Sequence, residues 1–150
     1  MIAVGCDHAG FCLKEEVLVC LKKRGLEYKD FGTYSLDSVD YPEFALAVAE
    51  AVASGECDRG VLICGTGIGI SIAANKVPGV RAALCMNSYM ARMTRMHNDS
   101  NILALGGRTM GVDLALDTLG AWLETDFLGG KHQVRLDKLA EIERKYDNKK

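Results

Sequence analysis

The chain is predicted to fold as a three-layer α/β/α sandwich, Rossmann-like, around a five-stranded parallel sheet. Short apolar runs of strand-forming residues alternate along it with longer segments of helical periodicity. This alternation is typical of a parallel sheet covered by helices on both faces. The length of 150 residues fits a single domain, and 16 glycines with only 2 prolines argue against a disordered tract.

Five runs are expected to form the strands. Four of them are mainly apolar, as strands buried on both faces usually are. The second is more polar, which places it near an edge of the sheet. In chain order, the runs are residues 2–6, 27–31, 60–64, 80–85 and 101–105.

Helical segments separate these strands. Apolar residues recur at helical spacing from Leu13 to Leu21, and Gly25 is a stop signal. Pro42 starts a helix rich in Ala and Val that ends at Ser54. One further helix is expected after the third strand and ends at about residue 75. Two more are expected at residues 88–97 and 112–127. A methionine stripe at helical spacing, expected in the core, consists of Met86, Met90, Met93 and Met96.

The end of the chain carries one narrow apolar stripe, formed by Leu136, Leu139, Ile142 and Tyr146 among charged residues. This stripe predicts a C-terminal helix at about residues 133–147. Two interpretations stand side by side: the helix packs on its own domain, or it crosses to a partner subunit.

Composition argues against several classes of function. The 18 basic and 20 acidic residues give a formal charge of −2, which does not suit a nucleic-acid binder. No apolar stretch approaches the ~18 residues of a membrane span. Six cysteines lie mostly in apolar runs with no signal peptide before them, so free thiols in a reducing cytoplasm are expected. Scattered His and Cys residues lack metal-ligand spacing, and no metal is expected.

Polar and glycine-rich segments follow the expected strands. In an open parallel sheet, ligands bind at the carboxyl ends of the strands. Residues 7–10 (DHAG) follow the first strand, residues 65–69 (GTGIG) the third, and residues 106–108 (GGR) the fifth. Residues 97–99 (HND) end a helix. These segments predict a site that contains titratable side chains and binds anions.

Cys64 ends an apolar strand and points into the glycine loop. Backbone N–H groups at the start of the next helix would favour a phosphate, a developing oxyanion or a thiolate. Cys64 is therefore a candidate nucleophile or general base, and an inert buried thiol beside an empty turn is the alternative. Ile70 stands where a dinucleotide fingerprint needs Gly and a cysteine phosphatase needs Arg.

Histidine and basic residues supply the other candidates. The end of a helix favours a protonated imidazole, so His97 is a candidate general acid. His8, beside a carboxylate, is a second candidate. Together with His8, the basic residues Arg108, Lys131 and Arg135 could gather around a dianion such as phosphate.

Six ordered segments resemble type B ribose-5-phosphate isomerase, in the ribose/galactose isomerase superfamily. They are residues 5–10 (GCDHAG), 30–33 (DFGT), 40–45 (DYPEFA), 63–71 (ICGTGIGIS), 97–99 (HND) and 129–132 (GGKH). The similarity extends from residue 2 to about residue 142. The chain departs from the family at Lys131, where Arg is usual, and Lys keeps the charge but lacks the bidentate fork.

The resemblance implies interconversion of ribose 5-phosphate and ribulose 5-phosphate through an enediolate, without metal or cofactor. It assigns proton transfer between C1 and C2 to Cys64, and ring opening to His97 with help from Asp7 and Thr66. The implied substrate-binding residues are Asp7, His8, Tyr41, Gly65, Thr66, Gly67, Ile68, Gly69, Asn98, Arg108, Lys131 and Arg135. It also implies a homodimer whose two active sites each take residues from both subunits, and pairing into tetramers stays open.

Other interpretations remain. An isomerase of allose 6-phosphate or galactose 6-phosphate belongs to the same superfamily. Subunits of the galactose enzyme typically lack parts of the Cys and His-Asn-Asp set that this chain keeps. A non-catalytic sugar-phosphate-binding module and a purely structural α/β protein are the candidates from other classes, and the concentration of polar groups after strands argues against the second.

Overall fold

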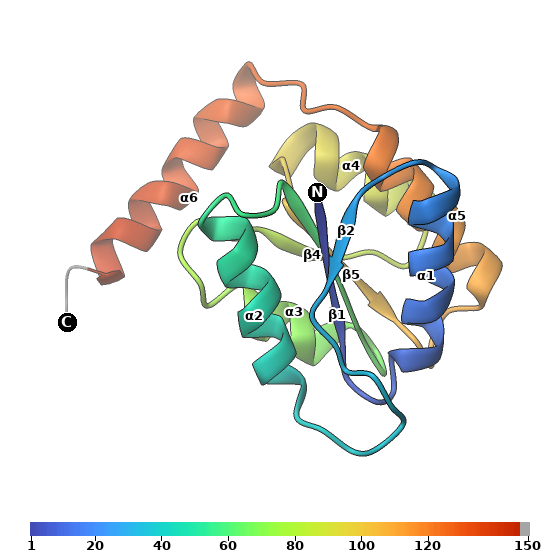
Figure 1. The fold of residues 1–150 in the computed structure, drawn as a ribbon. Helices are drawn as coiled ribbons and strands as arrows, with labels where there is room; N and C mark the ends of the chain where they lie inside the picture. The colour runs from blue at the N-terminus through green and yellow to red at the C-terminus, as the bar shows by residue number, and fades with distance from the viewer. Residues whose placement is uncertain (148–150) are drawn as a thin grey trace.

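The computed structural model describes residues 1–147, and its five strands form one parallel sheet in the order β2-β1-β3-β5-β4 (Figure 1). The central strands are continuous apolar runs, as burial on both faces requires. The more polar second strand lies at one edge, as its sequence predicts. The strands are β1 (Ile2–Cys6), β2 (Tyr28–Asp30), β3 (Arg59–Cys64), β4 (Ala82–Leu84) and β5 (Ile102–Gly106).

Helices cover both faces of the sheet, so the predicted three-layer sandwich is confirmed. One face is covered by α1 (Phe11–Lys23), α4 (Ser88–Asn98) and α5 (Val112–Glu124), and the other by α2 (Tyr41–Ala53) and α3 (Ile68–Ala74). Side chains alternate between the two cores along each strand. In β3, Ile63 faces α1 and α5, whereas Cys64 faces α2 and α3.

Three elements are shorter than their sequence predicts, and one of them is β2, which spans residues 28–30 of the expected 27–31. β4 spans three residues rather than the six expected, because it is an edge strand that pairs only with β5. α5 ends at Glu124, since Thr125 has an extended backbone, and residues 125–130 form a connecting loop.

The prediction that the methionine stripe lies in the core is wrong. α4 packs against α5 through the face that carries Ala91, Thr94 and Arg95. The opposite side of α4 faces away from the sheet. Met90 on this helix is 39% exposed, and Met86, just before the helix, is 45% exposed. Helical spacing fixed one face of the helix, but packing placed that face away from the sheet.

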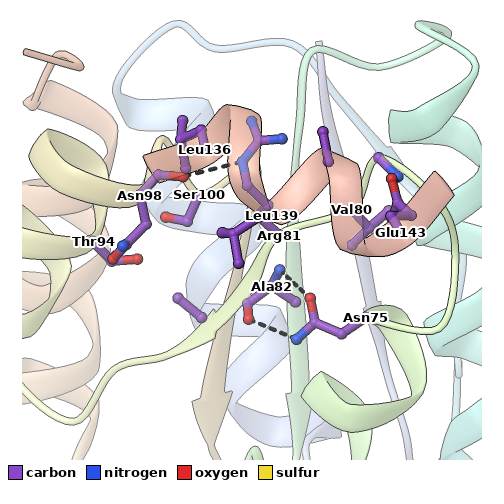
Figure 2. A pocket seen from close by; sticks show the side chains of 13 residues that line it. Asn75, Val80, Arg81, Ala82, Thr94, Asn98, Ser100, Leu136, Leu139 and Glu143 are labelled. Carbon is purple, nitrogen blue, oxygen red and sulfur yellow. Dashed lines mark hydrogen bonds between the residues drawn. The ribbon is translucent and has the colours of Figure 1, made fainter. Parts of the chain in front are cut away.

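The C-terminal helix α6 (Lys131–Asp147) stands apart from the sandwich (Figure 1). Leu136 is buried, whereas Leu139 and Ile142 are half exposed, so its own domain covers only part of the apolar stripe. A cavity of about 460 Å³ separates α6 from β4 and the end of α4 (Figure 2). It is lined by Asn75, Gly79, Val80, Arg81, Ala82, Ala83, Thr94, Asn98, Ser100, Leu136, Leu139, Ala140 and Glu143. Within residues 1–147, no helix is both long and apolar enough to span a membrane.

Candidate active site

Loops gather along two sides of the sheet, one at the carboxyl ends of the strands and one at their amino ends, and these sides are distinct from the edge strands β2 and β4. We call the edge where the strands end the carboxyl edge, and the edge where they begin the amino edge. The carboxyl edge carries residues 7–10, 65–69 and 106–108; the amino edge carries residues 97–99 and 128–135. Each helix of the sandwich starts near the carboxyl edge and returns to the amino edge.

At the carboxyl edge, three loops touch through backbone atoms. The N–H of Gly107 donates to the carbonyl of Cys64 at 2.8 Å. A Cβ atom on Gly107 would lie 2.6 Å from the carbonyl oxygen of Ala9, and one on Gly10 would overlap the carbonyl of Ile63. Glycine is required here because the loops approach too closely for a side chain. β1 and β3 are neighbours whose following helices cover opposite faces, which is where α/β sheets open a binding crevice.

Cys64 is the last residue of β3, directly before the glycine loop. Its side chain is buried, and its Sγ accepts a hydrogen bond from the N–H of Gly67 at 3.2 Å. Gly67 takes a left-handed conformation (φ 76°) just before α3, and this turn aims the amide at the sulfur.

Cys6 in β1 and Cys85 just after β4 are also buried thiols. Burial raises the pKa of Cys6 to about 12 and that of Cys85 to about 11. Both therefore stay protonated near neutral pH. Among these three thiols, only Cys64 has a loop amide directed at its sulfur.

Asp7 and His8 close the loop after β1. Oδ1 of Asp7 accepts hydrogen bonds from the N–H groups of Ala9 (2.9 Å) and Gly10 (3.1 Å), so one carboxylate oxygen shapes the turn. Nδ1 of His8 accepts from the N–H of Val39 at 3.2 Å. An acceptor at Nδ1 places the proton on Nε2, and His8 can offer that N–H to a ligand as a neutral donor.

Thr66, Tyr41 and Arg108 complete the carboxyl edge. The exposed Thr66 accepts a hydrogen bond from the N–H of Ile68 through Oγ1 at 3.2 Å. The ring of Tyr41 lies on Gly69, where an added Cβ would be 2.7 Å from Cζ. The exposed Arg108 side chain runs past Gly65 with Cδ 3.5 Å from an added Cβ. The predicted residues brought together here are Asp7, His8, Tyr41, Gly65, Thr66, Gly67, Ile68, Gly69, Arg108 and Cys64.

The remaining predicted residues lie at the amino edge. α4 ends with His97 and Asn98 immediately before β5, while Lys131 and Arg135 occupy the first turns of α6. β5 has five residues, so roughly 16 Å of strand separates the two edges. One chain therefore does not bring His97 to Cys64.

At the amino edge, His97 stacks on His132. The ring centroids are 4.3 Å apart and the planes differ by 13°. His132 is 7% exposed, and burial lowers its pKa, with further lowering by His97, Lys131 and Arg135. Sequence reasoning gave His132 little weight, although it stands in the GGKH segment that carries the resemblance. Within residues 1–147, no group of three or more His, Cys, Asp or Glu side chains is arranged to hold a metal ion.

Comparisons with known proteins point to one family. Residues 2–139 match the family model described as Ribose/Galactose Isomerase. The chain is 51% identical to ribose-5-phosphate isomerase B of Escherichia coli (strain K12), with 96% of this chain and 97% of that protein covered. It is 40% identical to D-erythrulose-4-phosphate isomerase of Pectobacterium atrosepticum, with 95% and 94% covered.

Solved structures give the same result. The structure of Clostridium thermocellum ribose-5-phosphate isomerase B matches with a TM-score of 0.96 at 65% identity, covering 97% of this chain and 98% of that one. The structure of ribose-5-phosphate isomerase B from Mycoplasma genitalium with bound ribulose-5-phosphate matches with a TM-score of 0.92 at 38% identity, covering 95% of each chain.

Proposed function

The chain belongs to the ribose/galactose isomerase family, and from this premise we propose that it interconverts D-ribose 5-phosphate and D-ribulose 5-phosphate. The observation that carries the proposal is the Cys64 sulfur, buried at the carboxyl edge under the N–H of Gly67. A base beside a row of backbone N–H groups suits a reaction that removes a proton next to a carbonyl and places negative charge on oxygen.

In the proposed chemistry, the Cys64 thiolate takes the proton from C2 of the open-chain aldose. The C2 electron pair moves into the C1–C2 bond, and the carbonyl electrons move to O1, which gives an enediolate. The N–H groups of Gly65 to Gly69 stabilise the charge on oxygen. The Cys64 thiol then returns the proton to C1 while the proton on O2 passes to O1, so that the C2 carbonyl forms and the ketose is complete. One base serves both directions.

We further propose that the site is completed by a second copy of the chain. The carboxyl edge holds the base, and the amino edge holds the candidate acid His97 and the cations Lys131 and Arg135. β4 is an edge strand, so a twofold axis beside it and perpendicular to the strands would bring the amino edge of one protomer next to the carboxyl edge of its partner. The outward Met86 and Met90 and the half-covered stripe of α6 support contact on this side.

In such a homodimer, His97 of the partner subunit donates the proton that opens the furanose ring, assisted by Asp7 and Thr66. Asn98 of the partner subunit binds sugar hydroxyls. The phosphate is held by His8 and Arg108 from one chain and by Lys131 and Arg135 of the partner subunit. α6 then packs on the partner through the part of its apolar stripe that its own domain leaves exposed. Six free thiols support a reducing, cytoplasmic setting for the enzyme.

The experiment that tests the function measures steady-state kinetics of the purified protein on a panel of sugar phosphates. The panel includes ribose 5-phosphate, allose 6-phosphate, galactose 6-phosphate and D-erythrulose 4-phosphate. The largest kcat/KM is expected with ribose 5-phosphate. A clear preference for another sugar would change the assigned substrate, and no turnover on any would favour a binding module.

A further inference from the structure

Asp99, the third residue of the His-Asn-Asp segment, has no place in the proposed chemistry, yet it is unusually constrained. Among residues 1–147, it is the only non-glycine residue with positive φ (43°). Its N–H donates to the carbonyl of Arg95 at 3.2 Å, and the N–H of Ser100 donates to that of Thr94 at 3.3 Å. The left-handed residue therefore ends α4 immediately after His97 and Asn98. Asp tolerates this conformation better than most residues.

Two arginines hold the Asp99 carboxylate. Oδ1 accepts from Nη1 of Arg95 at 2.8 Å, and Oδ2 accepts from Nη2 of Arg81 at 3.4 Å. Arg81 also donates to the backbone carbonyl of Asn98 through Nε at 3.0 Å, and to that of Asp99 through Nη2 at 2.9 Å. Figure 2 shows the contact between Arg81 and Asn98 beside the cavity under α6. The end of α4 is thus tied to the residue that precedes β4.

Arg95 connects this end to the core and to the loop before α6. It is 5% exposed, and its Nη1 also donates to the carbonyl of Ser100 at 2.6 Å. Its Nε donates to the carbonyl of Thr125 at 3.3 Å, and its guanidinium lies 5.9 Å from the ring of Trp122. The fully buried Trp122 in turn donates to Oγ of Ser100 at 2.9 Å.

The same connection governs where His132 lies. Residues 125–130 lead from α5 to α6, and this loop is bound to α4 through Arg95 and through the N–H of Leu128, which donates to the carbonyl of Met96 at 3.2 Å. Both rings of the His97–His132 stack therefore depend on the segment that Asp99 and Arg95 fix.

A glycine would end α4 in the same conformation without a carboxylate. Arg95 is buried, whereas the Asp99 and Arg81 side chains are 36% and 34% exposed, and such partly exposed ion pairs contribute little to stability. The best-attested use of an ion pair around a buried charge is to specify one geometry. A catalytic acid needs such a fixed position, because a misplacement of about 1 Å costs on the order of 10²-fold in rate.

We propose that Asp99 is a positioning residue for ring opening: through Arg95 and Arg81 it fixes His97 on His132 and sets the place of Asn98. This inference rests on the proposed role of His97 in the isomerase reaction. It assigns Asp99 no contact with substrate.

The test compares Asp99→Gly, which keeps the left-handed backbone without the carboxylate, with Asp99→Asn, which keeps one side-chain oxygen. Val52→Ala is the control. Val52 lies in the core on the α2 side of the sheet, so this substitution should lower the stability of the protein at a place away from His97. Turnover of ribose 5-phosphate, thermal midpoints and NMR spectra of Cε1-labelled histidine are measured for each protein. The chain has only three histidines, and His97→Asn and His132→Gln assign the signals.

Asp99→Gly is expected to lower kcat about 10–10²-fold with KM changed far less, and to shift or broaden the His97 and His132 signals. Asp99→Asn should recover part of both effects. The proposal is overturned if Asp99→Gly leaves the histidine signals unchanged, or if Val52→Ala loses as much kcat at an equal loss of thermal midpoint. If wild-type protein turns over no sugar phosphate, the proposed function fails, and the histidine signals still decide whether Asp99 holds the stack.

Discussion

The carboxyl and amino edges of the sheet are built in contrasting ways. At the carboxyl edge, glycines let three loops meet through backbone atoms, and N–H groups surround a single thiol. At the amino edge, two histidines stack among basic side chains, and Asp99 pairs with Arg81 and Arg95 beside them. The first edge is suited to charge that develops on oxygen, and the second to a phosphate and a proton donor. The proposal that each chain carries two unlike half-sites rests on this contrast.

The largest effect is expected from the thiol of the carboxyl edge. Cys64→Ala should lower kcat for ribose 5-phosphate by about 10²–10⁴-fold, because no other group at this edge replaces the base. Cys64→Ser serves as a control of similar size with a weaker base. Circular dichroism should show an unchanged fold for both, and near-normal isomerisation by Cys64→Ala would place the base elsewhere.

The next experiment asks whether the two half-sites come from different chains. Cys64→Ala and His97→Asn are each expected to be nearly inactive alone. After co-refolding in equal amounts, half of the dimers combine both variants, and each mixed dimer contains one site without either substitution. Activity should then recover to about a quarter of wild type. A mixture that stays inactive would mean that each site is built within one chain.

A Gly→Ala substitution should lower the free energy of unfolding more at the carboxyl edge than at the amino edge. Gly107→Ala places Cβ 2.6 Å from the carbonyl oxygen of Ala9, and this backbone clash should lower the free energy of unfolding by about 3 kcal/mol. Gly129→Ala meets no atom within 4 Å and suffers only from its positive φ (65°), with a loss of about 1 kcal/mol. Urea denaturation measures both. Equal losses would contradict the close backbone contact claimed for the carboxyl edge.

The smallest effect concerns the buried histidine of the amino edge. Because the pKa of His132 is lowered in the folded protein, the unfolded chain binds its proton more readily as pH falls below 6.5. The free energy of unfolding should therefore decrease on acidification through this range and be fully retained above it. His132→Gln should flatten that dependence in denaturant titrations between pH 8 and pH 5.5. The same slope in both proteins would assign the effect to other groups.

Much of the fold could be predicted from local sequence patterns. Apolar runs and helical spacing predicted all five strands and six helices, since periodicity and stop signals are properties of neighbouring residues. The glycine loop and Cys64 were equally visible, because a strand followed by glycines and a helix defines where a loop can present its N–H groups. The polar second strand also revealed its place at an edge of the sheet.

The sequence by itself thus determined the elements, the carboxyl-edge loops and the chemistry of the residues at both edges. Only the tertiary structure decided that β5 inserts between β3 and β4, that Met86 and Met90 face outward, and that His97 lies a strand length from Cys64. Periodicity defines an apolar face but not the neighbour that covers it. Strand order and helix direction depend on contacts between residues far apart in the chain, and these contacts placed the candidate site residues on opposite edges.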